Sequence, residues 1–271
     1  MLLKADAKQL EWVTKVFLSQ DPVALRELYN NEDLHSANQQ AFKLPTRVIA
    51  KNWLYRMIFA DAFSDRGFSG PAYAYANDPD FSHVSSSVRF WEGVVERFFD
   101  KYGGIYQHGV TSIAGAVEAG ILINPSGRFY RFKPYQRANG DWDWPRTNIL
   151  NYPVQGLAAD FMTLARRIAW KTILRSDKIL FVSTVHDDIE MDISLDIGKE
   201  TCYNILRGLE KCFTQIPAEF EKQYGTKVNV PLSGEVSLGW TLHESDMVKF
   251  KREEFDKIWQ EVNVSIKPHA A

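Results

Sequence analysis

Apolar positions divide the first part of the chain into one short strand and several helices. Residues 2–6 predict the strand, and apolar residues spaced three and four apart over residues 10–17 predict the first helix. Gln20-Asp21-Pro22 ends that helix and starts another short one. Thr46 is the predicted N-cap of a further helix, whose apolar and aromatic residues 52–63 indicate that it packs against other elements.

The rest of the chain alternates between helices and strands. Glycine, proline, serine and aspartate dominate residues 64–87, which predicts a loop, and residues 139–145 predict a tryptophan-rich loop. We expect helices over residues 88–102, 105–119, 155–175, 199–223 and 247–262, a hairpin over 121–135, and strands over 179–185, 189–193, 228–232 and 235–238. Because the strands are too widely spaced for regular βαβ units, we predict an α+β fold, a small antiparallel sheet with packed helices and a mostly helical insertion after its first strand.

Composition narrows the class of protein. The 271 residues are 45% hydrophobic and 24% charged, which fits one large or two smaller globular domains and excludes wholesale disorder. No apolar run approaches the roughly 20 residues of a membrane span. Cys202 and Cys212 fit neither a disulfide framework nor a zinc site, so we expect a cytoplasmic protein without a membrane partner.

The charge balance limits how the chain could bind nucleic acid. The net charge is −2, from 32 basic and 34 acidic residues. A self-sufficient nucleic-acid binder is usually more basic. Any such contact must therefore come from a local patch or be shared with another chain.

Carboxylates stand at the ends of two predicted strands. Asp6 closes the first strand, and Asp187-Asp188 forms the tip of a hydrophobic hairpin. Carboxylates brought together by one sheet could hold two divalent cations for an in-line phosphoryl displacement. The alternative is that Asp-Asp is an ordinary turn pair.

Arg47, Lys51, Tyr55 and Phe59 follow one another at intervals of four. Each step turns about 40° around a helix, so the first three share a face. Arginine and lysine there suit a triphosphate, and an aromatic ring suits a base or sugar. The alternative is an amphipathic helix with a basic rim.

Two later segments could contact nucleic acid. Residues 127–137 hold four basic residues and no acidic one, interleaved with aromatics, which would suit a phosphate backbone or a solvated hairpin face. Asn151 and Gln155 stand just before the predicted long helix, where they could contact nucleic acid or cap the helix.

In their order along the chain these motifs resemble the polymerase module of family A (DNA polymerase I-like) DNA polymerases, especially the phage-type branch. The matching segments, within residues 1–240, are Asp6-Ala7-Lys8-Gln9-Leu10-Glu11 (motif A), Asp33-Leu34-His35, the positions Arg47, Lys51, Tyr55, Phe59 and Ala60 (motif B), Gly127-Arg128, Asn151 with Gln155-Gly156, Ala159-Asp160, Val185-His186-Asp187-Asp188 (motif C), and Pro231-Leu232 with Glu235. The resemblance implies a DNA-directed DNA polymerase, a nucleotidyltransferase that adds dNTPs to a primer 3′-hydroxyl.

The resemblance also implies roles for individual residues. Asp6 and Asp187 would be catalytic ligands of two Mg²⁺ ions, for which Mn²⁺ would substitute, and Asp188 would be a supporting carboxylate. Lys51 would bind the triphosphate and donate a proton to the leaving group. The other nucleotide-binding positions are Arg47, Tyr55, Gln9, Glu11, His35 and Phe59, and the DNA-binding positions are Arg128, Asn151, Gln155 and His186. A tyrosine at position 55 goes with tolerance of dideoxynucleotides in this family.

Several positions depart from the family pattern. Asp188 replaces the usual glutamate, a longer carboxylate, and Phe59-Ala60 replaces Tyr-Gly beside the templating base. Arg146 is one residue out of register with an arginine that often precedes Asn151. These positions place the role of Asp188 and the fidelity of synthesis in question.

The resemblance divides the chain into a first palm segment (1–34), fingers and the following hairpin (35–138), a second palm segment (139–243) and a tail (244–271). Family members place a thumb, the first palm strands and usually an exonuclease before motif A. We expect a two-chain, split polymerase whose second polypeptide supplies the thumb, the remaining palm and any 3′–5′ exonuclease, acting on primer–template DNA in a host cytoplasm if the source is viral.

Two other classes compete with this interpretation. A non-catalytic DNA-binding or scaffold remnant would keep the fold without the chemistry. A metal-dependent phosphohydrolase would use the carboxylates but would have no use for the helix that carries Arg47, Lys51 and Tyr55.

Overall fold

A computed structural model describes residues 1–59, 62–63, 66–173 and 176–264 of the chain. The chain forms two compact units, one made of Met1–Leu10 with Ala158–Ala271 and the other of Glu11–Leu157. Within the described residues, no helix combines the length and the apolar character needed to cross a membrane. The limits predicted for palm, fingers and tail remain a prediction.

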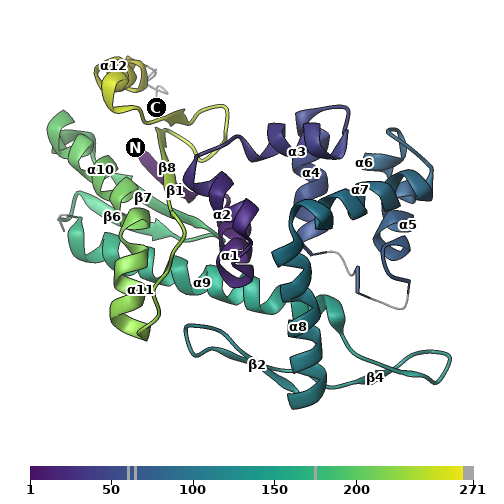
Figure 1. Cartoon of the computed structure of the whole chain (residues 1–271). Coiled ribbons are helices and arrows are strands. Elements are labelled where there is room, and N and C mark those ends of the chain that lie inside the picture. The colour runs from purple at the N-terminus through teal and green to yellow at the C-terminus, as the bar shows by residue number, and fades with distance from the viewer. Residues whose placement is uncertain (60–61, 64–65, 174–175, 265–271) are drawn as a thin grey trace. The chain divides into compact units, whose positions relative to one another are not determined.

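The first unit is built on a five-stranded antiparallel sheet in the order β6-β7-β1-β8-β9 (Figure 1). Its central strand, β1, alternates between buried and half-buried positions. Alternate residues of a strand point to opposite faces, so Leu3, Ala5 and Ala7 share the buried face and Lys4 and Asp6 lie on the other. The five strands are β1 (Leu2–Ala7), β6 (Ile179–Ser183), β7 (Asp188–Ile193), β8 (Gly234–Gly239) and β9 (Val248–Lys249).

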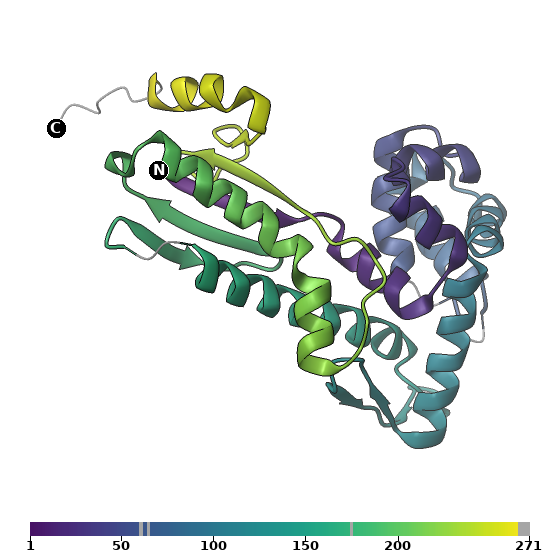
Figure 2. The same ribbon diagram turned by 60° about the vertical axis from the view of Figure 1, so that its left-hand side comes forward.

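Helix α10 covers the apolar face of this sheet. It packs against β1 and β8, as Figure 2 shows, and buries Ile205, Leu206 and Leu209 along one side. The helical elements of this unit are the second part of α9 (Arg146–Thr172), η1 (Leu195–Ile197), α10 (Lys199–Thr214), α11 (Ile216–Tyr224), η2 (Arg252–Glu254) and α12 (Phe255–Val264).

The second unit is mostly helical, with two short strand pairs. Its helices are α1 (Leu10–Ser19), α2 (Pro22–Tyr29), α3 (Leu34–Phe42), α4 (Arg47–Ile58), α5 (Ser69–Asn77), α6 (Pro79–Ser82), α7 (Val88–Lys101), α8 (Gly103–Ala119) and the start of α9, and its strands are β2 (Ile121–Ile123), β3 (Phe129–Arg131), β4 (Tyr135–Gln136) and β5 (Trp142–Asp143). Aromatic rings in edge contact form its core, where Trp53 packs against Phe42 and Phe98. Such pairs add about 0.5–1.5 kcal/mol each beyond the area they bury.

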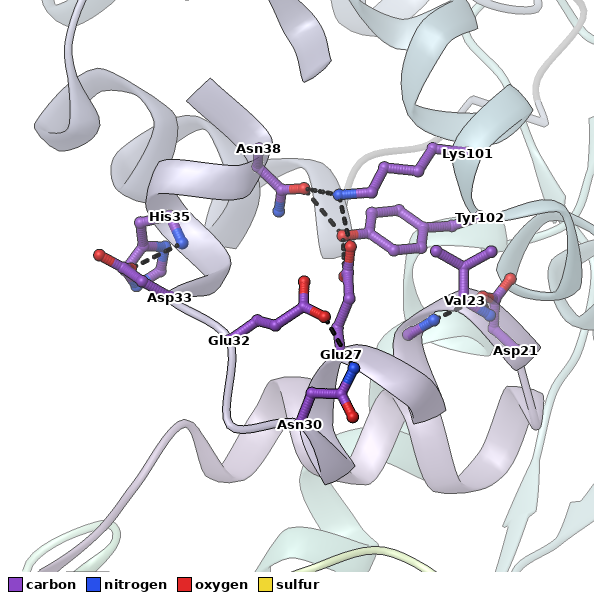
Figure 3. A network of polar contacts seen from close by, with 11 residues as sticks. Asp21, Val23, Glu27, Asn30, Glu32, Asp33, His35, Asn38, Lys101 and Tyr102 are labelled. Carbon is purple, nitrogen blue, oxygen red and sulfur yellow. Dashed lines mark hydrogen bonds and ion pairs between the residues drawn. The ribbon is translucent and has the colours of Figure 1, made fainter. Parts of the chain in front are cut away.

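A buried polar network ties three of these helices together (Figure 3). The Tyr102 hydroxyl lies 2.7 Å from Glu27 Oε2 and 2.8 Å from Asn38 Oδ1, and Lys101 Nζ donates to the same Asn38 oxygen at 2.7 Å. Burial raises the pKa of Tyr102 above its usual value, and the nearby Glu27 carboxylate raises it further. These hydrogen bonds link α2, α3 and α7, although Asn38 Nδ2 is buried and has no hydrogen-bond partner among the described residues.

Nearby, Asp21 caps two helices at once. Its carboxylate accepts hydrogen bonds from Val23 N and Ala24 N in α2, and from Gly104 N and Ile105 N in α8. The side chain is fully buried, so these bonds replace its hydration.

The predicted α+β class with a small antiparallel sheet is confirmed, but several elements differ from expectation. Residues 64 and 65 of the predicted loop lie outside the described residues, and its remainder holds α5 and α6, because α5 packs against α7 and buries Ala72, Tyr75 and Ala76. The helix α3 was not predicted, and residues 228–232 form no strand. The tryptophan-rich loop contains β5, and the helix expected over 199–223 is broken into α10 and α11 next to Pro217.

The long helix begins at Arg146, nine residues before its predicted start at residue 155, and carries Pro153 inside it. Proline lacks the N–H that would bond the preceding turn. Asn124 Nδ2 donates to the Pro153 carbonyl at 2.8 Å, so a side chain from the β2–β3 turn supports the helix at this point. Residues 174 and 175 of the predicted helix, residues 60 and 61 of the predicted 52–63 segment, and residues 265–271 of the tail lie outside the described residues.

Candidate functional site

The sheet brings three predicted carboxylates together. β1 pairs with β7 so that Asp6 stands directly opposite Asp188, and Asp187 precedes Asp188 in the turn from β6. One carboxylate oxygen from each of the three lies within 4.8 Å of the other two. Like charges opposite one another on a sheet are destabilising unless a counter-charge is present.

The proximity of these carboxylates changes the pKa of Asp6. Partial burial, the adjoining Asp188 carboxyl and the negative charges of Asp187 and Asp188 raise the pKa of Asp6 to about 7. Lys4 opposes that shift. A carboxyl group in this state gains from any cation placed among the three oxygens.

Lys4 is the counter-charge that the sequence analysis missed. Its Nζ lies 2.8 Å from Asp188 Oδ2, and this hydrogen bond raises the pKa of Lys4. The other oxygen, Asp188 Oδ1, is buried and has no hydrogen-bond partner among the described residues. The strand periodicity places Lys4 on the face of Asp6, but only the pairing of β1 with β7 reveals its contact with Asp188.

The donor set fits a hard divalent cation. Three carboxylates, one with an unpartnered buried oxygen, offer the oxygen ligands that Mg²⁺ and Mn²⁺ prefer. Cysteine is not part of the cluster, since Cys202 and Cys212 are buried thiols with raised pKa values of about 12.

The turn that carries Asp187 is shaped by its backbone. His186 adopts the left-handed conformation with φ of 52°, and its carbonyl accepts a hydrogen bond from Arg166 at 3.2 Å. Ala7 N donates to the Asp187 carbonyl at 3.2 Å, which continues the β1–β7 pairing to the tip. The His186 side chain is exposed, and Gln9 lies in the turn after β1 with φ of 50°.

In the second unit, α4 carries Arg47, Lys51 and Tyr55 on one face, and Phe59 follows at its C-cap. Thr46 accepts from Ile49 N and caps the helix as predicted, so Arg47 stands in its first turn. Arg47 and Lys51 are exposed, whereas Tyr55 is half-buried. Phe59 is half-buried at the C-cap, and Ala60 lies outside the described residues.

Arg47 is held by a carboxylate from the preceding helix. Its Nε and Nη2 donate to Asp33 at 2.8 and 3.0 Å, and Asp33 also caps α3. The Arg47 guanidinium keeps the pKa of Asp33 well below its usual range. Both side chains are about half exposed, so water and salt screen the attraction between them.

His35 completes this group. It is 5% exposed, its ring centroid lies 5.9 Å from that of Tyr55, and its Nδ1 has no hydrogen-bond partner among the described residues. Burial and then the positive charge of Arg47 lower the pKa of His35. His35 is therefore neutral near pH 7. Glu11 lies in the first turn of α1 and is half-buried.

The predicted DNA-binding segments lie where a hairpin meets a helix. Arg128 is exposed before β3, and Gln155 is exposed on α9, whereas Asn151 is half-buried with an unpartnered Oδ1 among the described residues. Gly156 lies against the Tyr130 ring, where an added Cβ would fall 1.6 Å from the tyrosine hydroxyl oxygen. The hairpin and helix are therefore closely fitted.

The basic character of this hairpin is weaker than its sequence indicates. Arg137 Nη2 donates to Asp143 at 2.6 Å, and Arg146 donates to the same carboxylate at 2.7 Å. Asp143 is beyond the segment that contains no acidic residue, so the sequence pattern hid this pairing. The exposed basic side chains of the hairpin are Arg128, Arg131 and Lys133.

Comparison with known proteins supports a distant relationship to DNA polymerases. No protein-family model matches the chain. It is 24% identical over 218 residues to DNA polymerase I of Borreliella burgdorferi, which covers 76% of this chain and 23% of that protein.

A solved structure resembles the fold. The polymerase domain of Pol1 from M. smegmatis, in complex with DNA primer–template and dNTP, matches with a TM-score of 0.59 and 21% identity, over 88% of this chain and 39% of that one. The chain has the fold of a DNA polymerase domain. It spans less than half the length of either of these proteins.

Proposed function

We propose that this chain carries the nucleotidyl-transfer site of a family A DNA polymerase and catalyses template-directed addition of dNTPs to a primer 3′-hydroxyl. The observation that carries the proposal is that Asp6 on β1, Asp188 at the start of β7 and Asp187 in the turn before it come together in a polymerase-type fold. The complex of the similar M. smegmatis domain with primer–template and dNTP supports the same substrate classes.

Asp6 and Asp187 would hold divalent cations, Mg²⁺ with Mn²⁺ as a substitute. When bound, two such ions stabilise the attacking and leaving oxygens of an in-line phosphoryl displacement. Asp188 would be a supporting carboxylate, although its side chain is shorter than that of a glutamate. Its Oδ2 accepts a hydrogen bond from Lys4.

The exposed face of α4 would bind the triphosphate. Arg47 would exchange the Asp33 carboxylate for phosphate oxygens, because both groups accept a bidentate arginine. Lys51, one turn later, would bind the same phosphates as a point charge and donate a proton to the leaving pyrophosphate. Tyr55 and Phe59 would contact the nucleotide further along the helix, and His35 lies beside Tyr55 as a neutral hydrogen-bonding group.

Other residues would contact the sugar and the DNA. Gln9 and Glu11 follow β1 in the chain, where Glu11 would press on the sugar and exclude a 2′-hydroxyl. The remaining contacts to primer and template would come from Arg128, Asn151, Gln155 and His186.

A second polypeptide that supplies the thumb, further palm strands and any exonuclease remains a prediction, as do the phage-type branch and a cytoplasmic location. The low net charge of this chain supports a shared grip on DNA. Extension that appears only when a thumb-bearing chain is added would support the split arrangement. A fully active, monodisperse monomer would contradict it.

Primer extension tests the proposed activity. With Mg²⁺, primer–template and all four dNTPs, the chain should extend the primer, alone or after a thumb-bearing chain is added, and Asp187→Asn should lower this extension by at least about 10³-fold, as expected for loss of a metal ligand. Asp196→Asn is the matched control, since Asp196 is an exposed aspartate of the same unit, paired with Lys178. Its activity should equal that of the unsubstituted chain.

Nucleotide binding distinguishes a scaffold remnant from an enzyme that awaits its partner. Mg²⁺-dependent dNTP binding, weakened by Arg47→Ala and Lys51→Ala, is expected even when the chain alone does not extend a primer. A folded chain that binds primer–template but no dNTP would favour the scaffold alternative.

A further inference from the structure

Lys4 lies inside the carboxylate cluster. It stands two residues before Asp6 on β1 and therefore on the same face of the sheet. The pairing with β7 sets Lys4 opposite Glu190 and Asp6 opposite Asp188. The Lys4 ammonium reaches diagonally to Asp188 Oδ2 at 2.8 Å.

Burial makes this ion pair stronger than an ordinary surface pair. The Asp188 side chain is 11% exposed and that of Lys4 is 32% exposed. Exposed pairs such as Lys178–Asp196 are screened by water and salt, whereas partly buried pairs are screened much less. Removing one partner here would leave a nearly buried carboxylate without its counter-charge.

The contact leaves Asp188 with one oxygen engaged and one unengaged. Oδ2 accepts from Lys4, whereas Oδ1 is buried and has no hydrogen-bond partner within the described ranges. One oxygen of Asp188 lies within 4.8 Å of oxygens of both Asp6 and Asp187. The Asp188 carboxylate therefore faces the cluster and not the solvent.

We propose that Lys4 is a positioning residue of the metal site, which fixes Asp188 and lowers the negative charge of the cluster from three units to two. The inference rests on the proposed function, in which the cluster binds divalent cations. Lys4 weakens cation binding by its charge and prevents Asp188 from closing on the ion through both oxygens. Asp6 and Asp187 then remain the main ligands, and bound cations stay exchangeable.

A purely structural role would give a different result. A cross-strand ion pair that only stabilises the sheet would change the unfolding free energy when removed and leave the metal affinity of the folded protein unchanged. Metal affinity is therefore the readout that separates the two roles.

The test measures Mn²⁺ binding to the full chain by electron paramagnetic resonance at pH 8. Removal of a unit positive charge this close to a divalent ion should tighten binding about three- to tenfold in Lys4→Met. Asp188→Asn should weaken binding by a similar factor. The double variant Lys4→Met/Asp188→Asn should return close to the affinity of the unsubstituted chain.

Two controls keep the test decisive. Lys178→Met removes a lysine from an ion pair of the same unit, with a 2.7 Å contact to Asp196, and should leave Mn²⁺ affinity unchanged. Lys4→Gln makes the same charge change with a polar side chain, and takes the place of Lys4→Met if circular dichroism shows that variant to be unfolded.

Each outcome has a defined meaning. Unchanged or weaker Mn²⁺ binding by folded Lys4→Met or Lys4→Gln overturns the role of Lys4, while the metal site itself stands. If the unsubstituted chain shows no Mn²⁺ binding that depends on Asp187, the proposed function fails first, and the role of Lys4 fails with it.

Discussion

At the scale of single residues, the site is a set of charges that the fold forces together. Asp6, Asp187 and Asp188 would repel one another in the absence of a cation, and Lys4 relieves only part of that repulsion. Sites of this kind are commonly less stable than their surroundings because function requires the clustered charge. The cost should be visible in the stability of the protein.

The raised pKa of Asp6 predicts how stability depends on pH. Between its unfolded value near 3.8 and its folded value of about 7, the folded state holds a proton that the unfolded state has lost. Without divalent cations, the unfolding free energy should therefore fall as pH rises through this window. Above pH 7, Asp6→Asn should raise it by about 1–2 kcal/mol, after allowance for solvent screening of a half-exposed group.

This prediction is checked by measuring the unfolding free energy in urea at pH 5.5 and pH 8, with a chelator present to remove divalent cations. Asp6→Asn should be more stable than the unsubstituted chain at pH 8, and by about half that margin at pH 5.5, which lies midway between the unfolded and folded pKa values of 3.8 and about 7. Mg²⁺ should stabilise the unsubstituted chain at pH 8 and have little effect on Asp6→Asn. An equal loss of stability in Asp6→Asn at both pH values would mean that the carboxylate stabilises the fold.

At the scale of elements, close fitting holds the β2–β3 hairpin against the start of α9. Asn124 bonds the carbonyl of Pro153, and Tyr130 lies against Gly156. The hairpin carries Arg128, and α9 carries Asn151 and Gln155. This packing therefore fixes the spacing between the predicted DNA contacts.

Gly156→Ala sets two effects against each other. Helix propensity alone favours alanine by about 1 kcal/mol. The new Cβ, however, would fall 1.6 Å from the Tyr130 hydroxyl oxygen and 2.8 Å from the ring carbon that bears it. Overpacking of this kind costs about 1–3 kcal/mol, so Gly156→Ala should be destabilising.

Thermal unfolding of matched variants tests this packing. Gly103→Ala, also in a helix but with nothing within 4 Å of the added Cβ, should be neutral or stabilising. Gly156→Ala should cost less stability when it is added to Tyr130→Ala than when it is added to the unsubstituted chain, because the tyrosine ring is then absent. A stabilised Gly156→Ala variant would show that Tyr130 moves aside at no cost.

The sequence predicted the elements that have strong local signals and missed contacts that depend on pairing. Thr46 and the apolar repeat after it predict α4 closely, and Gly120 ends α8 as expected. The contacts of Lys4 with Asp188, and of Arg47 with Asp33, join segments whose proximity no local pattern indicates. The glycine and proline of the α5 segment are turn residues and predict a loop, but packing against α7 outweighs their propensity.

At the scale of the whole molecule, ion pairs occupy much of the positive charge. Basic residues of both units are bound to carboxylates in the pairs Arg56–Asp78, Arg167–Glu219, Arg252–Glu210 and Lys249–Glu235. With a net charge of −2, the chain has no overall excess of positive charge to attract phosphates. Its affinity for DNA should therefore be weak and should come from a local basic patch.

The salt dependence of DNA binding measures how many phosphate contacts the chain makes. If Arg128, Arg131 and Lys133 make the main phosphate contacts, the slope of log Kobs against log salt should be about −3, since each contact contributes about −0.9. Arg128→Ala should reduce the slope by about one contact, whereas Arg137→Ala should leave it nearly unchanged because Arg137 is paired with Asp143. Fluorescence anisotropy of a labelled primer–template between 50 and 200 mM salt gives both values. A slope steeper than about −6 for this chain alone would reveal a second basic surface on it. If the slope becomes that steep only after a second polypeptide is added, the second basic surface belongs to that polypeptide.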